Sequence, residues 1–593
     1  MRRTIRAVAA AVLLAQPGTG AAEDLKPALV AQAEFLRPDG TIATAIAEGE
    51  TVTVRVSVAS GFSSQPPSGL TLFGWLRQVS ASDLPCGQSA ESFARTGRLP
   101  AGAIFLNDPV IGVVTEDDAL VLSDPEFSLA SANIMGAFRL DERPSTLVPD
   151  PDSRRFLLAL PSAGEVLAVG PTGQRETVVA GLHRPAQLVA GPAGGILVRQ
   201  DDGQLLFATR SQRHEIARGV ATLRAARDQR WAAALDARHA LVIDAQQGAI
   251  VARVGAPDAL DVAILHDDQA DRPFAIAVLR RDTVAVHYLG DIEAPVIIPL
   301  ADQAARLVAS PRGRVVLAWT PSGGRVNVVD VARSRLVRAV GANAPFTEIA
   351  FSEDTAFLML ASQTHVGALD LAAIARGEDA NFREIQIGSS TVPPSGSARQ
   401  LLAPLFPMEG MLAVHADSYQ GYRIMDGSVM GDAPAMTATS LRGGVPRLVA
   451  TLDRSFVEIR PGLFETVTAL PRTGRFELVI STGLGELNFC SEVPVANPHG
   501  PPPDPVGTIT ALRDGDAVRF RVMGPDDRPQ GNARGRITFS ALAGGWRASA
   551  PLITDAEGRS KLAYTLPRLS GIVVQFDARG TSRYRPLLLE DME

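Results

Sequence analysis

Two adjacent residues, His183 and Arg184, combine a titratable ring with a permanent cation in one short connection. They stand in the segment Gly181-Leu-His-Arg-Pro185, between two strand-like runs. An imidazole binds metals and exchanges protons near neutral pH, and a guanidinium pairs with carboxylates. We therefore predict that His183 and Arg184 bind a cofactor or partner. A surface histidine in a turn is the alternative explanation.

Methionine is concentrated in one short stretch of the chain. Five of the ten methionines lie there, with one histidine among them: Met408, Met411, Met425, Met430, Met436 and His415. Thioethers and imidazoles are suitable ligands for Cu(I), so Met408, Met411 and His415 are predicted as a copper site. Methionine also fills irregular apolar cores, and this alternative stays open.

Two charged segments have the composition of tight turns. Asp150-Pro-Asp-Ser-Arg-Arg155 and Ser310-Pro-Arg-Gly-Arg314 each separate two apolar runs. Proline, aspartate, serine and glycine are the residues that hairpin turns select. Both segments are predicted to connect the first and second strands of a repeat, without a chemical role.

The first 22 residues have the pattern of a secretory signal. Three arginines precede the apolar run Ala7–Ala15, and small residues follow at 20–22. A basic start, a short apolar segment and a small-residue cleavage site are typical of Sec export. Nine apolar residues are too few for a membrane-spanning helix. The protein is therefore expected to be periplasmic or secreted, without a membrane span.

Cys86 and Cys490 are the only cysteines of the chain. In an exported protein, two cysteines favour a disulfide, although two buried thiols remain the alternative. The bond would close a loop of about 400 residues, for which the chain-entropy estimate is about 6 kcal/mol. We predict a structural disulfide.

Several chemistries are disfavoured by what the sequence lacks. It contains no Cys-x-x-Cys-His, Gly-x-Ser-x-Gly, P-loop, EF-hand or His-Glu-x-x-His motif, so no catalytic residue is predicted. Lysine occurs only at Lys26 and Lys561, outside the repeats, which disfavours Schiff-base chemistry. A net charge of −7 without a basic block disfavours nucleic-acid binding.

Short strand-like runs recur about every forty residues between 120 and 426. Eight of them are found: Leu120–Asp124, Glu165–Val169, Gln204–Phe207, Leu241–Asp244, Val284–Tyr288, Val326–Asp330, Val366–Asp370 and Tyr422–Asp426. This period, with several short strands in each unit, predicts an all-β fold built around a β-propeller. Eight blades are predicted, and seven remain possible because a terminal blade often borrows a strand.

The best-formed repeats are Leu307–Trp319 with Arg325–Asp330, and Ile349–Leu360 with Val366–Asp370. Here the sequence resembles the YVTN-type propellers of secreted bacterial proteins, which are similar to the haem d1 domain of cytochrome cd1. The resemblance covers roughly residues 104–445. It implies the fold, and it implies haem d1 as one cofactor, held by a propeller histidine with arginines for the haem carboxylates.

The flanks of the repeats predict two immunoglobulin-like modules. Neither the first flank, residues 23–103, nor the second, 446–496, has enough strands for a sandwich, but together they have about seven. We therefore predict one split domain that contains the propeller of residues 104–445. A proline-rich linker, 497–506, leads to a second module at 507–593.

The leading functional hypothesis is an exported, non-enzymatic binding or assembly protein, monomeric, for a protein partner or a small molecule. A redox or metal protein that binds haem d1 or copper is the second. A propeller hydrolase of the lactonase kind is the third. Because propellers host unrelated functions, the fold does not decide among them.

Overall fold

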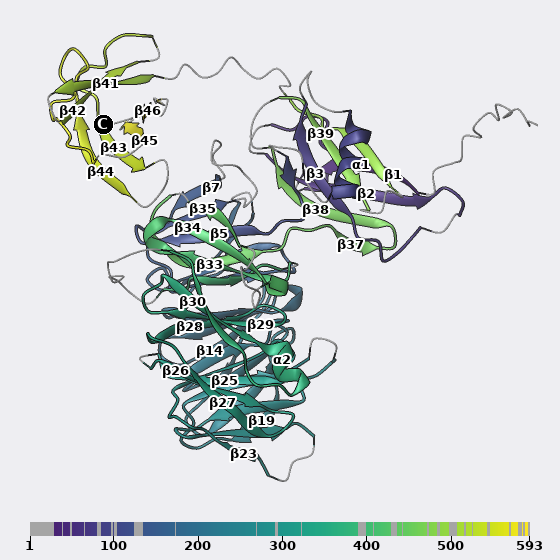
Figure 1. Ribbon diagram of the computed structural model, residues 1–593. Helices are drawn as coiled ribbons and strands as arrows, with labels where there is room; N and C mark the ends of the chain where they lie inside the picture. Colours follow the sequence, from purple (N-terminus) through teal and green to yellow (C-terminus); the bar gives the residue numbers. More distant parts are fainter. Residues whose placement is uncertain are drawn as a thin grey trace, which may run out of the picture.

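The computed structural model describes residues 29–496 and 507–590, apart from short segments, of which the longest are 124–133, 389–398 and 429–435. The predicted signal at 1–22, the linker at 497–506 and Met430 therefore lie outside the described residues. Figure 1 shows three bodies of β-structure: a large central one, a smaller one at the upper right, and a yellow C-terminal one at the upper left.

Eight four-stranded antiparallel sheets are formed by residues 110–452. Each sheet takes its name from its innermost strand, and the strands of a sheet are given from the innermost to the outermost. The first four are β8 (Thr146–Asp150), β9 (Arg155–Leu160), β10 (Glu165–Val169), β11 (Arg175–Val179); β12 (Pro185–Ala190), β13 (Ile196–Gln200), β14 (Leu205–Ala208), β15 (Arg213–Ala217); β16 (Thr222–Ala225), β17 (Trp231–Leu235), β18 (His239–Asp244), β19 (Ala249–Gly255); β20 (Asp261–Leu265), β21 (Ala275–Leu279), β22 (Thr283–Tyr288), β23 (Val296–Pro299). The others are β24 (Arg306–Ala309), β25 (Val315–Trp319), β26 (Arg325–Asp330), β27 (Arg335–Gly341); β28 (Phe346–Phe351), β29 (Thr355–Leu360), β30 (His365–Asp370), β31 (Phe382–Gln386); β32 (Leu402–Pro404), β33 (Gly410–His415), β34 (Gln420–Met425), β35 (Met436–Ser440); β36 (Pro446–Leu452), β5 (Val110–Thr115), β6 (Ala119–Ser123), β7 (Ile134–Arg139).

These sheets pack face to face in a closed ring. Seven apolar clusters join each sheet to the next, and one of them spans the β28, β32 and β36 sheets. Second strands such as β21, β25 and β29 are buried along their whole length, because both of their faces contact a neighbouring sheet. Outer strands such as β15 are mostly exposed. The predicted all-β fold and β-propeller are confirmed.

The recurrent runs in the sequence mark one position of the propeller. Each of the eight overlaps the third strand of its sheet, from β6 through β10, β14, β18, β22, β26 and β30 to β34. Third strands are mostly apolar and buried, which explains why the pattern was visible. The first and fourth strands vary more because they face the channel and the solvent.

The ring closes where strands from its two ends pair. β36, from the end of the ring, pairs antiparallel with β5, with Thr451 opposite Ile111 and Leu452 opposite Val110. β36 lies beyond the sequence-based boundary at residue 445. β4 (Ile104–Phe105), inside the predicted propeller range, pairs instead with the flanking strand β3 (Phe73–Gln78).

The two flanks form a sandwich together. One sheet has the order β1-β2-β38-β37 and the other β4-β3-β39-β40, so each sheet combines strands from before and after the propeller. The remaining strands are β1 (Leu29–Leu36), β2 (Thr51–Ser60), β37 (Val457–Arg460), β38 (Leu463–Ala469), β39 (Phe476–Ser481) and β40 (Asn488–Glu492). In Figure 1 purple and green strands accordingly lie together in this body. The immunoglobulin-like assignment remains a prediction, which the order of the strands supports.

Two arginines hold the sandwich on the propeller, one of them buried and the other partly exposed. Arg454, 1% exposed, donates to the carbonyl oxygens of Asp108 (3.0 Å) and Phe105 (2.6 Å). Arg154, from the β8–β9 turn, donates to the carbonyl oxygen of Ser455 at 2.7 Å. A guanidinium satisfies several carbonyl groups at once, which suits a junction where the chain runs without regular pairing. The sandwich is thus anchored beside the turns that follow the inner strands.

A disulfide joins Cys86 to Cys490, as predicted, with their Cα atoms 6.2 Å apart. Cys86 begins α1 (Cys86–Thr96), a helix that the sequence analysis missed. The helix packs on β39 and β40, and its Phe93 ring lies 4.8 Å from the ring of Trp75. The bond therefore links the two halves of the sandwich across the inserted propeller.

We expect replacement of both cysteines by serine to lower the melting temperature of the sandwich, with a loss of about 2–5 kcal/mol in unfolding free energy. The propeller should keep its β-type circular dichroism, since the bond lies outside the ring. Calorimetry of wild type and double variant measures the difference. An unchanged melting profile, with two titratable thiols in unreduced wild type, would contradict the prediction.

The C-terminal module has its own core. It consists of β41 (Thr508–Asp514) with β42 (Ala517–Met523), and of the sheet β44 (Arg547–Ile553), β43 (Arg534–Ala541), β45 (Gly571–Ala578) and β46 (Leu587–Glu590). Phe520, Phe539 and Tyr564 pack together at its centre.

A second short helix, α2 (Leu371–Arg376), lies in the propeller. No helix within the described residues is long and apolar enough to cross a bilayer.

Candidate functional site: the central cavity

A cavity of about 600 Å³ occupies the centre of the ring. All eight inner strands contribute to its wall, and so do turns that follow them, such as 226–229 and 310–311. Most lining side chains are apolar, among them Leu188, Ile264, Leu307, Phe351 and Phe406. A concave, largely apolar space of this size with a few polar groups is typical of small-molecule sites.

One buried ion pair belongs to the cavity wall. Arg224, on β16, donates from Nη2 to Oδ2 of Asp261 at 3.0 Å, and Asp261 is fully buried. The backbone N–H of Leu307 donates to the same oxygen at 3.0 Å. The carboxylate thus links three successive inner strands, β16, β20 and β24. Its role is to fix the wall, because its charge is already matched.

A second pair consists of His266 and Asp228. His266 Nε2 lies 3.0 Å from Asp228 Oδ2, and the imidazole is almost fully buried. Gly313, in the turn between β24 and β25, packs against the backbone at the end of β20. It has φ = +64°, and a Cβ atom there would lie 2.7 Å from the backbone nitrogen of His266. The position therefore requires glycine. His266 Nδ1 is buried without a partner among the described residues.

A third group of charges crosses the end of the cavity. Arg227 forms a hydrogen-bonded ion pair with Glu353, and its guanidinium lies 4.3 Å from the centre of the Phe406 ring. Arg312 also binds Glu353, at 2.9 Å from Nη2. Burial raises the pKa of Glu353, but hydrogen bonds from Arg312 and Arg227 outweigh it and hold the pKa below its ordinary value.

Glu348, on β28, is an isolated carboxyl group inside the ring. The backbone N–H of Leu401 donates to it at 2.6 Å, and that of Leu402 does so too, which joins the β28 and β32 sheets. These bonds favour the charged form, but burial outweighs them and raises the pKa of Glu348 to about 8. The group is therefore mostly protonated at neutral pH.

We expect Glu348→Gln to change how stability depends on pH. Between the ordinary pKa of 4.5 and about 8, folded wild type keeps a proton that the unfolded chain releases, so its stability falls as pH rises through this interval. The variant, which has no such group, should gain stability relative to wild type at pH 8.5 and not at pH 4. Urea unfolding at both values measures this. Parallel curves for the two proteins would contradict the raised pKa.

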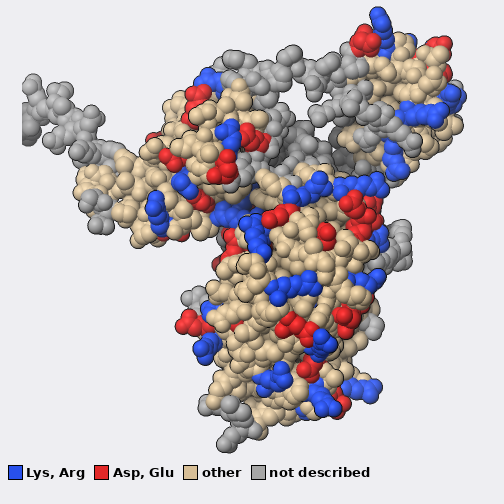
Figure 2. Space-filling model, turned by 180° about the vertical axis from the view of Figure 1, so that it is seen from behind, with Lys and Arg blue, Asp and Glu red and all other residues tan. Residues whose placement is uncertain are grey.

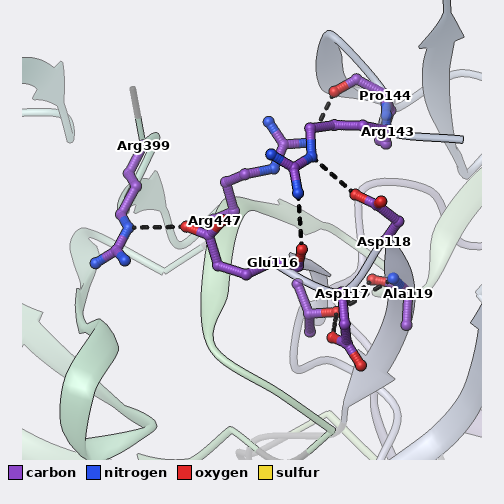
Figure 3. A network of polar contacts seen from close by, with 9 residues as sticks. Glu116, Asp117, Asp118, Ala119, Arg143, Pro144, Arg399 and Arg447 are labelled. Atoms are coloured by element: carbon purple, nitrogen blue, oxygen red, sulfur yellow. Dashed lines mark hydrogen bonds and ion pairs between the residues drawn. The ribbon is translucent and has the colours of Figure 1, made fainter. Parts of the chain in front are cut away.

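The opposite end of the ring carries a polar network that the sequence analysis missed (Figure 3). Arg143 binds Asp118 at 3.0 Å, and Arg399 binds Glu116 at 3.2 Å. Arg447, 5% exposed, donates to the carbonyl oxygen of Pro144 at 2.7 Å. These residues come from the β5–β6 turn, from the start of β36, and from the connections into β8 and β32. The network therefore secures the closure of the ring.

His183 and Arg184 are not among the residues that line the cavity. They precede β12, so they lie at the end of the ring opposite to the turns that line it. His183 Nδ1 lies 3.8 Å from Asp202, Arg184 binds Asp201 at 2.8 Å, and both side chains are more than half exposed. Their predicted role in binding stays a prediction.

The proposed copper ligands are not brought together. Met411 and His415 lie on one face of β33, four residues apart, which separates them by about 13 Å. Met411 is fully buried in an apolar cluster, and Met408 packs against it. His415 Nδ1 bonds to Ser418 Oγ at 2.7 Å. The arrangement corresponds to packing, the alternative that the sequence left open.

The residues that line the cavity do not fit a bound haem d1. His266 is the histidine of the cavity wall, but Nε2 is held by Asp228 and Nδ1 is buried. Arg224 and Arg227, which would bind the haem carboxylates, are paired with Asp261 and Glu353. In the described part of the chain, no three His, Cys, Asp or Glu side chains are grouped as metal ligands.

The residues at the end of the cavity were visible in the sequence only as turns. Arg312 lies in the segment 310–314, which was predicted to be a hairpin turn, and the structure confirms that turn between β24 and β25. Arg227, Glu353 and Phe406 lie in equivalent turns of other sheets. One signal could have found them: charged or aromatic residues recurring after the first strand of several repeats.

No family model matches the chain, and no curated protein matches it. Similar solved structures include apo AztD from Citrobacter koseri, with 13% identity, a TM-score of 0.42, and coverage of 58% of this chain and 98% of the other. Hydrazine synthase of Kuenenia stuttgartiensis has 10% identity and a TM-score of 0.32, and the match covers 59% of this chain and 95% of the other. Dihydro-heme d1 dehydrogenase NirN in complex with DHE has 13% identity and a TM-score of 0.34, and the match covers 54% of this chain and 79% of the other. Similarity this low carries no argument about activity.

Proposed function

We propose that this chain is an exported binding protein that holds a small, largely apolar molecule in the centre of its propeller. The cavity of about 600 Å³ carries this proposal. Its wall is apolar enough to bind a hydrophobic body, and its few charged groups lie at one end, where they can orient a polar head.

The state of the polar groups supports binding over catalysis. Arg224 is paired with Asp261, His266 with Asp228, and Arg227 with Glu353. A catalytic base or nucleophile is expected to face the substrate with an unoccupied atom. In this wall each of these three basic side chains is held by a carboxylate, and His266 Nδ1, which has no partner among the described residues, is buried, which suits a rigid receptor.

The sandwich supplies a second surface beside the cavity. Arg154 and Arg454 anchor it next to the turns that surround the charged end. A partner that contacts the sandwich would therefore stand close to a ligand leaving the propeller. On the face seen in Figure 2, acidic and basic side chains are interspersed, as expected for a protein whose partner is not a nucleic acid.

Filling the cavity should abolish binding of a neutral apolar probe. Ala225 lies on β16, lines the cavity and is exposed to it, so Ala225→Trp places an indole in the open space. Equilibrium dialysis with 2-naphthamide should show binding to wild type and a loss of at least about tenfold in the variant. Val251→Trp on the outer strand β19, where Val251 is 51% exposed, is the control and should bind normally. Equal binding by all three proteins would contradict the proposed site.

Export through the Sec route predicts that the N-terminus of the mature protein lies at the signal cleavage site. Intact-mass analysis of protein taken from its natural source should find a chain that begins after Ala22, within a few residues, and that contains one disulfide. A chain that retains residues 1–22 would contradict cleavage of a Sec-type signal, and two free thiols would contradict the Cys86–Cys490 disulfide.

A further inference from the structure

Arg227, Glu353 and Phe406 form a bridge over the charged end of the cavity. Arg227 follows β16, Glu353 follows β28 and Phe406 follows β32. In the ring, the β16 sheet has the β12 and β20 sheets as its neighbours. A contact from Arg227 to the β28 and β32 sheets therefore runs across the opening, and the three side chains partly close it.

Two guanidinium groups converge on the single carboxylate of this bridge. Arg227 bonds to Oε2 of Glu353, whereas Arg312 donates to Oε1 from Nε at 3.1 Å and from Nη2 at 2.9 Å. Guanidinium groups match carboxylate oxygens in shape and charge. Two of them from different sheets, each on its own oxygen, make a receptor for one carboxylate.

The turn that carries Glu353 is held from outside the cavity. Asp426 accepts from Ser352 Oγ at 2.6 Å and from the backbone N–H of Asp354 at 3.1 Å. The backbone of this turn is thus fixed, and only the Glu353 side chain has to rotate for the bridge to open. Arg227 lines the cavity and lies over Phe406, so its guanidinium stays above the apolar space when Glu353 leaves.

We propose that Glu353 is an internal occupant of a carboxylate-binding site, and that the natural ligand is an apolar acid whose carboxylate takes its place between Arg227 and Arg312. This inference rests on the proposed binding function and names the class of ligand. Each oxygen of Glu353 already takes one guanidinium, so a ligand carboxylate can bind both arginines in this way only when the Glu353 side chain leaves. Binding therefore displaces Glu353 and opens the bridge, while the apolar body of the acid lies in the cavity.

Other charges near the bridge set the selectivity for one acid group. Asp228 and Asp453 also line the cavity, and Asp354 and Asp267 lie close to Arg312. A ligand with a single carboxylate meets both arginines, whereas a dianion would also meet these acidic groups. The site thus fits a monoacid.

The test compares two probes of the same shape, 2-naphthoate and its neutral amide, 2-naphthamide, by equilibrium dialysis at low salt. Glu353→Gln removes the competing charge and should tighten naphthoate binding by about tenfold, with naphthamide affinity changed less than about twofold. Arg227→Gln and Arg312→Gln should each weaken naphthoate binding by about tenfold and leave naphthamide binding in place. Glu215→Gln, at an exposed pair with Arg218 on the outer strand β15, is the control and should match wild type.

The outcomes separate this inference from the proposed function. If neither probe binds wild type or any variant, the cavity is not a binding site and the proposed function fails. If naphthamide binds but Glu353→Gln leaves naphthoate affinity unchanged, the carboxylate site is wrong and the binding function stands. Arg312, with a side chain 66% exposed, can be replaced without disturbing the core, so its variant decides the matter even if Glu353→Gln unfolds.

Discussion

The pairing of β36 with β5 is the contact on which the rest of the structure depends. It joins residues more than 300 positions apart and turns a row of sheets into a ring. Without it, the β8 and β32 sheets would each lose a neighbour and expose apolar faces that are now buried. Because a ring encloses a space and a row does not, the central cavity exists only through this closure.

The same pairing places the two flanks together. β5 follows β4 within a few residues, and β36 is followed closely by β37, so closure brings both ends of the ring to one point. Arg454 then binds carbonyl groups of Phe105 and Asp108 at that point. The sandwich sheets, which combine strands from both flanks, and the Cys86–Cys490 bond follow from this proximity.

The sequence was sufficient for the propeller but not for its site. Third strands such as Val326–Asp330 are local patterns, and a period of about forty residues exposes them. The cavity groups belong to different repeats, and their meeting depends on ring geometry that no local pattern encodes. Arg312 was correctly placed in a hairpin turn, but the residues that favour a turn give no indication of its contact with Glu353.

The residues predicted to do chemistry were identified from sequence neighbourhood and from ligand type. His183 and Arg184 are adjacent in the sequence and each lies near an aspartate on the surface, and their role in binding remains a prediction. Met411 and His415 were selected for ligand type, and the geometry of one strand keeps them apart. Side chains that act together are usually neighbours in space, and in a propeller these come from different sheets.

The interrupted sandwich has a consequence for the order in which the protein is made. About 350 residues separate β4 from β37, so β2 and β3 leave the ribosome long before their partners β38 and β39 exist. At about 5–20 residues per second, the delay is roughly 20–70 s. During this time the apolar strand Thr51–Ser60 has an unpaired edge, which is a template for aggregation. The sandwich therefore cannot be completed until every residue of the inserted propeller has been made, so the length of the insert sets the earliest time at which its host domain can close.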